Sequence, residues 1–309
     1  MISGPSPHDQ ADQNRDGRVI GAVDIIIVNW NSGPWLRNCL ESIARFDEGV
    51  NQVIVVDNGS VDGSAEAEAP ALRHRLVRTG ANLGFGKACN LGAKSATAPY
   101  LLFLNPDAAL LEGALPKAVA LMDSEAGART GICGVQLVGD DGATQHHTAN
   151  FPTPGTIFTH EQRQTRFDHV HSRKVDHVIG AFYLIRRSLF EMLGGFDERF
   201  FVYLEDVDLS RRAHVAGWES YYLAEAKAFH KGGGTSEQVK AQRLFYALRS
   251  RILYAFKHFS RVQAWRRRCW CCSCWSGSRS RWSSDRRCCS ASLGLDCTAG
   301  SSRSTSFER

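Results

Sequence analysis

The stretch that most constrains this chain is a run of five apolar residues, Tyr100 to Leu104, that leads directly into Asn105, Pro106 and Asp107. An apolar run without alternation is typical of a strand that is buried on both faces, in a parallel or mixed sheet covered by helices. Pro106 cannot donate to the hydrogen-bond ladder, so we expect the strand to end before it. Asp107 would then lie at the carboxyl end of a central strand, where open α/β sheets bind ligands.

The residues after this strand have two interpretations. Carboxylate oxygens are preferred ligands of hard divalent cations, so Asp107 could hold such an ion. Asn, Pro and Asp are also common turn residues, so the same segment could simply end a strand. The rest of the chain favours the cation.

The composition is that of an ordinary globular protein. The chain has 309 residues, of which 43% are hydrophobic and 22% charged, and this length suits one large domain or two small ones. The net charge of +5 permits attraction to an anionic substrate or membrane surface and gives no indication of nucleic-acid binding. No stretch reaches the roughly 18 unbroken apolar residues of a membrane span.

Composition also divides the chain into three parts. Residues 1–20 are polar and lack the apolar core of a signal peptide, so we expect a flexible arm. Residues 21–260 alternate between predicted strands and helices and hold only three of the ten cysteines, which indicates one domain in a reducing compartment. Residues 261–309 are crowded with Cys, Arg, Ser and Trp and have no apolar period.

This irregular tail has several explanations. A zinc module is one, since Cys269 and Cys272, like Cys271 and Cys274, have CxxC spacing, but residues 261–309 hold no histidine partner. We prefer a frameshift, because leucine CTG codons that are read one base later become cysteine TGC codons. In either case we expect residues 261–309 to be disordered and to carry no chemistry.

Strand and helix patterns alternate between residues 23 and 265, which predicts βαβ units and a largely parallel sheet. The expected strands are 23–30, 52–57, 74–80, 100–104, 131–138, 178–185 and a short one within 221–229. The expected helices are 35–46, one starting at 87, 112–123, 187–193, one starting at 205, and a basic helix at 237–265. That last helix could pack on the domain or lie on an anionic membrane surface.

Polar residues follow two more strands. Asp57 ends the second strand, where an acid often hydrogen-bonds a nucleoside, although a helix cap or turn explains it equally well. The glycine-rich segment 82–92 matches neither GxGxxG nor GxxxxGK[ST]. Lys87, near the start of a predicted helix, could face an anion or be an ordinary surface lysine.

A second group of acids begins the helix at residue 205. Glu205, Asp206 and Asp208 follow an aromatic run, and acids in a first turn are favoured by the helix dipole. Clustered desolvated acids also gain proton affinity, which suits a general base. His230 ends the last strand, where neutral imidazole can complete a metal site with oxygen donors, although a lone histidine is more often structural. The polar segment 143–174 shows no paired metal motif and could be a binding lid.

Taken together, these motifs resemble the family 2 glycosyltransferases of the GT-A fold, and within them the bacterial rhamnosyltransferase-like group. The matching pieces are IIIVNWN at 25–31, VIVVDNGSVDGS at 53–64, NLGFGKACNLG at 82–92, LLFLNPDA at 101–108, a long motif at 180–218, and AFHKGGGTS at 228–236. The resemblance implies an α/β nucleotide-diphospho-sugar transferase domain over residues 21–260, with a mixed, mostly parallel sheet flanked by helices.

The resemblance also implies roles for single residues. Asp107 would bind Mg²⁺ or Mn²⁺ together with the donor diphosphate, in an Asp-x-Asp motif whose first position is Asn105 here. Asp206 would be the catalytic base with Glu205 beside it, and His230 would join the metal or diphosphate. The residues expected along the nucleotide and donor are Asn29, Asn31, Asp57, Asn82, Lys87 and Asn105.

The implied reaction is inverting transfer of a sugar, best guessed as rhamnose from dTDP-rhamnose, to a saccharide or polyprenyl-linked acceptor in cell-wall polysaccharide synthesis. One cation neutralises the leaving diphosphate and one base takes the acceptor proton. We expect a cytoplasmic protein with peripheral membrane contact. The alternatives are another sugar (galactofuranose, glucose or N-acetylglucosamine), a non-catalytic nucleotide-sugar-binding scaffold, and a nucleotidyltransferase, whose basic triphosphate loop is missing at 29–34.

Overall fold

The computed structural model describes residues 22–67, 69, 71–145, 150–158, 167–232 and 240–259. The predicted N-terminal arm and the predicted irregular tail, with its frameshift explanation, lie outside these described residues. So do three histidines of the polar segment, His146, His147 and His160.

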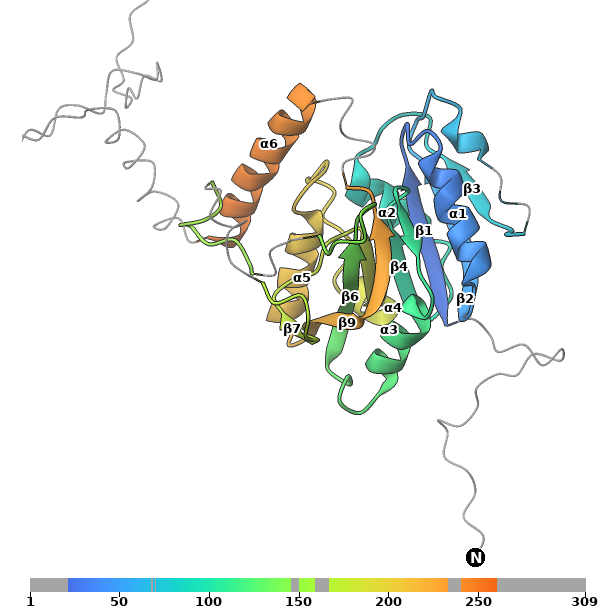
Figure 1. The fold of residues 1–309 in the computed structure, drawn as a ribbon. Helices are drawn as coiled ribbons and strands as arrows, with labels where there is room; N and C mark the ends of the chain where they lie inside the picture. Colours follow the sequence, from blue (N-terminus) through green and yellow to red (C-terminus); the bar gives the residue numbers. More distant parts are fainter. Residues whose placement is uncertain are drawn as a thin grey trace, which may run out of the picture. The chain divides into compact units, whose positions relative to one another are not determined.

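The core of the domain is a nine-stranded mixed sheet with the order β3-β2-β1-β4-β8-β6-β9-β5, in which β7 also pairs with β9 (Figure 1). Six strands run in one direction and β5, β7 and β8 run in the other. The strands are β1 (Val23–Asn29), β2 (Val50–Asp57), β3 (Arg75–Arg78), β4 (Tyr100–Leu104), β5 (Ala108–Leu110), β6 (Thr130–Val138), β7 (Arg173–Val175), β8 (Phe182–Arg186) and β9 (Glu219–His230).

Helices flank the sheet (Figure 1) because the central strands are apolar on both sides. Ile25 and Leu102 pack in a cluster with residues of α1 and α3, whereas their neighbours Ile26 and Phe103 pack in a second cluster with residues of α2, α4 and α5. The helices are α1 (Trp35–Arg45), α2 (Phe85–Ala93), α3 (Ala114–Asp123), α4 (Arg187–Met192), α5 (Glu205–Val215) and α6 (Lys240–His258), with a short 3₁₀ turn η1 at Ser64–Glu66.

The predicted central strand is confirmed. All five residues of β4 are buried, and the strand ends at Leu104, two residues before the proline. The α/β class and the mixed sheet flanked by helices are confirmed as well. Among the described residues, no helix is both long enough and apolar enough to cross a lipid bilayer.

Some predicted boundaries are wrong for reasons that involve distant parts of the chain. The strand expected at 178–185 begins only at Phe182, because the Gly180 N–H donates to the Asp206 side chain instead of to a neighbouring strand. The strand expected to be short, β9, has 12 residues. The strands β5 and β7, of three residues each, were not predicted, since runs this short carry no periodic signal.

Candidate active site

A cavity of about 820 Å³ lies where β1, β2 and β4 end and α5 begins. Six of the ten residues that the sequence predicts for the site line this cavity. These are Asn82, Asn105, Asp107, Glu205, Asp206 and His230. The other four, which do not line this cavity, are Asn29, Asn31, Asp57 and Lys87.

Asp107 and His230 come together through strand pairing. After Pro106 the chain turns into β5, which runs antiparallel to the end of β9 so that Ala108 lies opposite His230. The Asp107 carboxylate is almost fully buried, and one of its oxygens lies 3.5 Å from Nε2 of His230. Two residues separated by more than 120 positions thus face one point of the cavity.

Gln145 orients the His230 ring. Its side-chain oxygen lies 2.9 Å from Nδ1 of His230, and its amide nitrogen donates to the His230 backbone carbonyl. An amide oxygen only accepts, so Nδ1 is the donor in this contact; in the neutral tautomer of the ring, the lone pair then lies on Nε2, on the side of Asp107. No sequence pattern pointed to Gln145, because its contact with His230 depends on the turn after β6.

The pair Asp107 and His230 fits a divalent cation that is shared with a substrate. Within the described part of the chain, no group of three or more His, Cys, Asp or Glu side chains has the arrangement of a metal cage. Mg²⁺ is commonly held by one or two protein groups and completed by substrate phosphates and water. One carboxylate and one imidazole with a free Nε2 lone pair, side by side on a cavity wall, provide that kind of incomplete site.

The backbone that leads into α5 is strained. Tyr203 and Leu204 have φ angles of 71° and 67°, in the left-handed region that non-glycine residues seldom adopt. Such a conformation costs about 1–3 kcal/mol per residue and persists only where the surroundings hold it. Two contacts do so here: the Phe201 carbonyl accepts the Phe85 N–H at 2.7 Å, and the Val202 carbonyl accepts the Ser250 hydroxyl at 2.7 Å.

This turn aims Asp206 into the cavity. One carboxylate oxygen accepts the Gly180 N–H at 2.9 Å, and the other accepts the N–H of Val207 at 2.8 Å. A Cβ at position 180 would lie 3.3 Å from the same carboxylate oxygen, so glycine permits this close approach. Asp206 is therefore a positioned acid on the cavity wall.

The neighbouring Glu205 is in a different environment. Its burial, and then the charge of Asp206, raise the pKa of Glu205 well above its ordinary value. Its Oε2 atom is buried and has no hydrogen-bond partner among the described residues. These conditions favour the neutral acid, so the two adjacent carboxyl groups are suited to different roles.

His177 is a buried histidine that sequence reasoning did not select. Burial lowers the pKa of His177, although the charge of Asp206 acts in the opposite direction. Its ring stacks on Phe151, with ring centroids 6.2 Å apart. A neutral imidazole electrostatically coupled to Asp206 thus belongs to the surroundings of the candidate base.

Asn29 and Asp57 meet, but behind the cavity wall. The Asn29 amide nitrogen lies 3.1 Å from the Asp57 carboxylate and 3.0 Å from the hydroxyls of Ser60 and Ser64. Asn31 joins the same loops, because its N–H donates to the Ser60 hydroxyl and its side chain accepts the Val61 N–H. In this structure these polar groups hold the β1 and β2 loops together.

Asn58 links that loop network to the cavity. Its amide nitrogen donates to the Asn82 side chain at 3.0 Å, and its side-chain oxygen accepts the Leu83 N–H at 2.9 Å. Asn58 lines the cavity, although the sequence analysis did not single it out. The only available signal was its place directly after Asp57 in the motif.

Lys87 is on the surface in this structure. Its ammonium group lies 3.7 Å from the Glu198 carboxylate, and both side chains are about half exposed, at 49% and 48%. Exposed pairs of this kind contribute about 0–1 kcal/mol. In this structure Lys87 thus pairs with Glu198 at the surface, and its contact with the donor stays a prediction.

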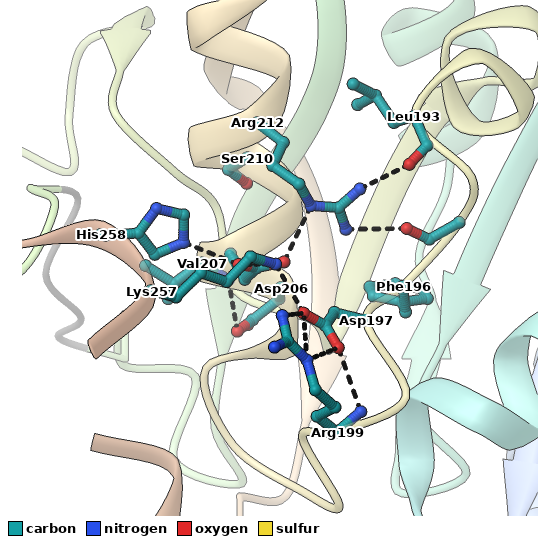
Figure 2. A network of polar contacts seen from close by, with 12 residues as sticks. Leu193, Phe196, Asp197, Arg199, Asp206, Val207, Ser210, Arg212, Lys257 and His258 are labelled. Carbon is teal, nitrogen blue, oxygen red and sulfur yellow. Dashed lines mark hydrogen bonds and ion pairs between the residues drawn. The ribbon is translucent and has the colours of Figure 1, made fainter. Parts of the chain in front are cut away.

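A polar network behind Asp206 fastens α5 to α6 (Figure 2). Asp208 is fully buried and lies 2.8 Å from the Arg212 guanidinium, 2.7 Å from the Lys257 ammonium and 2.7 Å from His258. Lys257 also bonds Asp197 at 2.6 Å. This network fixes the position of α6 next to the candidate base.

We expect acid to weaken this network. Burial opposes ionisation of Asp208, but hydrogen bonds from His258 and Lys257 outweigh it and lower its pKa. Hydrogen bonding from Arg199, against the effect of burial, lowers the pKa of Asp197. Because both pKa values are depressed on folding, both carboxylates stabilise the fold above the unfolded value near 4, and that stability is lost as pH falls below it.

The measurement is urea unfolding between pH 8 and pH 2, with Asp208→Asn beside the wild type. The substitution should lower the free energy of unfolding at pH 7 by about 2–4 kcal/mol, because it removes the buried negative charge that Arg212, Lys257 and His258 share. It should also make the free energy of unfolding depend less steeply on pH below about pH 4. Asp168→Asn is the matched control, since Asp168 is exposed and hydrogen-bonded to His171, and it should change little. Equal midpoints for wild type and Asp208→Asn would show that the network does not hold the domain together.

Comparison with known proteins gives matches over much of the described part of the chain. Residues 24–194 match the family model described as glycosyl transferase family 2. The chain is 33% identical over 233 residues to the N-acetylglucosaminyl-diphospho-decaprenol L-rhamnosyltransferase of Mycobacterium tuberculosis, covering 67% of this chain and 75% of that protein. It is also 26% identical over 255 residues to rhamnosyltransferase WbbL of Escherichia coli, covering 75% of this chain and 92% of that protein.

Solved structures share the fold at lower identity. The mannosyltransferase PcManGT of Pyrobaculum calidifontis, in complex with GDP-Man and Mn²⁺, has a TM-score of 0.52 and 20% identity over 75% of this chain and 64% of that one. Residues 1–349 of S. aureus TarS give a TM-score of 0.50 and 19% identity. That match covers 68% of this chain and 60% of the TarS chain.

Proposed function

Because this chain belongs to the family 2 glycosyltransferases and is related to bacterial rhamnosyltransferases, we propose that it moves L-rhamnose from dTDP-β-L-rhamnose to a saccharide or polyprenyl-linked acceptor. The GT-A fold that the motifs implied is confirmed by the structural neighbours. The observation that carries the proposal is one cavity whose lining holds both the Asp107–His230 pair and Asp206.

The donor diphosphate is proposed to lie at Asp107 and His230. These two side chains would hold Mg²⁺ or Mn²⁺, which when bound neutralises the negative charge that develops on the leaving diphosphate. Asn82, which Asn58 holds in place, and Asn105 line the same cavity and can donate hydrogen bonds to the donor. Gln145 keeps the Nε2 lone pair of His230 available to the metal.

The acceptor hydroxyl is proposed to lie at Asp206. The Asp206 carboxylate takes the hydroxyl proton as the hydroxyl oxygen attacks C1 of the sugar. The new C1–O bond forms while the bond from C1 to the diphosphate oxygen breaks, and the nucleoside diphosphate leaves with that electron pair. Asp206 then releases the proton to water. One displacement from the opposite face inverts C1, so a β-linked donor gives an α-linked product.

The acceptor class rests on similarity. The name of the mycobacterial relative specifies a decaprenol-linked N-acetylglucosaminyl diphosphate. We carry a polyprenyl-linked saccharide over to this chain as the proposed acceptor class, and a role in cell-wall or surface polysaccharide synthesis with it.

The test is transfer from a panel of nucleotide sugars to a polyprenyl-diphospho-N-acetylglucosamine acceptor, with and without Mn²⁺, followed by release of the nucleoside diphosphate. We expect dTDP-β-L-rhamnose to react fastest and chelation of the metal to stop the reaction. If another nucleotide sugar reacted fastest, the sugar assignment would change, but the proposed displacement with Asp206 as base would not. Binding of a nucleotide sugar without turnover of any donor would instead favour a non-catalytic scaffold.

A further inference from the structure

The outer face of α6 carries an exposed apolar stripe. Its five members are large side chains that are 41–66% exposed. They are Leu244, Phe245, Leu248, Ile252 and Phe256. At 3.6 residues per turn they fall within an arc of about 120°, so they form one continuous strip along the helix.

The charges of α6 are all of one sign. Between residues 240 and 259 the chain has five Lys or Arg residues and no Asp or Glu. In the same helical projection, Arg249 lies just beyond one edge of the apolar stripe and Arg251 just beyond the other. Arg249 is exposed and Arg251 is partly exposed, so both are available to anions.

The opposite face of α6 is firmly attached to the domain. Tyr254 is fully buried, Lys257 bonds Asp197 and Asp208, and the Ser250 hydroxyl bonds the Val202 carbonyl. The apolar stripe is therefore not an incompletely packed inner face. The stripe lies on the face of α6 opposite to the contacts that fix the helix on the domain.

The attached face also borders the cavity. Tyr246 stacks on Phe201 with ring centroids 4.4 Å apart, and Gln242, Arg243 and Tyr246 line the cavity wall. A partner bound along the stripe would consequently lie beside the cavity that contains Asp206.

We propose that this stripe, Leu244 to Phe256 with Arg249 and Arg251 at its edges, is a docking surface for an anionic phospholipid bilayer. A helix with an apolar strip and cationic flanks lies in the plane of a membrane interface, where apolar burial and attraction to acidic headgroups add. A membrane is favoured over a protein because every formal charge on the helix is positive and the apolar strip runs its length. The purpose of docking, to bring the cavity to a lipid-linked acceptor, rests on the proposed function; the binding itself does not.

The experiment is co-sedimentation of the full chain with vesicles of phosphatidylglycerol and phosphatidylcholine, compared with phosphatidylcholine alone. The wild type should bind the anionic vesicles and bind the zwitterionic ones weakly. Phe245→Glu/Phe256→Glu should reduce the partition coefficient at least about tenfold, since apolar area is lost and negative charge is added. Met192→Glu/Val215→Glu is the matched control, because it makes the same charge change at two apolar residues that are 60% and 80% exposed elsewhere. It should bind the anionic vesicles more tightly than Phe245→Glu/Phe256→Glu does, since its apolar stripe is intact.

A second variant protects the test from a folding defect. Arg249→Gln/Arg251→Gln leaves the apolar stripe intact and should weaken binding to anionic vesicles severalfold at 0.1 M salt, and less at 0.5 M salt. Circular dichroism of each variant serves to test whether it is folded.

Two results would overturn the proposal. The first is undiminished vesicle binding by Phe245→Glu/Phe256→Glu, which would place membrane contact on another part of the chain. The second is a wild type that sediments as a dimer and binds no vesicles while the double variant is monomeric, which would make the stripe an interface between two copies. Nucleoside diphosphate release with a water-soluble acceptor measures the proposed reaction without a membrane. This assay therefore distinguishes failure of membrane docking from failure of the proposed reaction.

Discussion

Asp206→Asn should retain donor binding and lose turnover by roughly 10²–10⁴-fold, the usual contribution of a positioned general base. The amide has nearly the same shape as the carboxylate but cannot take a proton from the acceptor hydroxyl. Nucleoside diphosphate release gives the rate, and calorimetric titration with the nucleoside diphosphate gives the affinity. The amide nitrogen of the introduced side chain would face the N–H of Gly180 or of Val207, and two donors cannot hydrogen-bond each other. We therefore expect a small loss of stability as well.

Glu205→Gln is the matched control for this prediction. Glu205 is buried and its pKa is raised by burial and by Asp206, so an amide should replace the neutral acid with less than about a tenfold loss of rate. If Glu205→Gln were as slow as Asp206→Asn, the assignment of a single base would be wrong.

Asp107→Ala should abolish the dependence of donor binding on the metal. The variant loses the one carboxylate of the proposed cation pair, and the affinity for the Mn²⁺–nucleoside diphosphate complex should fall by at least roughly 100-fold. His230→Ala should cause a smaller loss, since the carboxylate remains. Calorimetry with and without Mn²⁺, together with the electron paramagnetic resonance signal of free Mn²⁺, measures both effects without needing turnover.

Glu125→Ala is the control for charge, because Glu125 is an exposed acid outside the cavity. It should bind the metal complex as the wild type does. Equal metal-dependent affinities for wild type and Asp107→Ala would contradict the position proposed for the diphosphate.

Much of the fold was predictable because its signals are local. The apolar run of β4 ends where Pro106 prevents the strand from continuing, so the place of Asp107 at a strand end followed from adjacent residues. The first helix was also predictable, since its apolar residues recur at helical spacing and four of them are buried.

What the sequence did not reveal depends on distant pairing. Asp107 faces His230 because β5 pairs with β9, and a three-residue strand gives no periodic signal. The same holds for Gln145, which reaches His230 across 85 positions, and for Gly180, whose N–H leaves the expected strand for Asp206. Motifs named the candidate residues, but only the three-dimensional structure placed six of them in one cavity.

The structure also separates residues that the motifs grouped together. Asn29 and Asp57 were predicted along the nucleotide. In this structure the Asn29 amide instead donates hydrogen bonds to Asp57 and to the Ser60 hydroxyl, and neither Asn29 nor Asp57 lines the cavity. A run of polar residues after a strand looks the same in sequence whether it binds a ligand or ties two loops together. A nucleoside contact by these residues therefore remains a proposal.

The most direct test of the central claim is the anomeric configuration of the product. The wild-type protein is given dTDP-β-L-rhamnose, the polyprenyl-linked acceptor and Mn²⁺, and the new glycosidic bond is examined by nuclear magnetic resonance. A single displacement assisted by Asp206 predicts an α-linked rhamnoside. A β-linked product would contradict the account, since retention requires a second displacement that one base in this cavity does not provide.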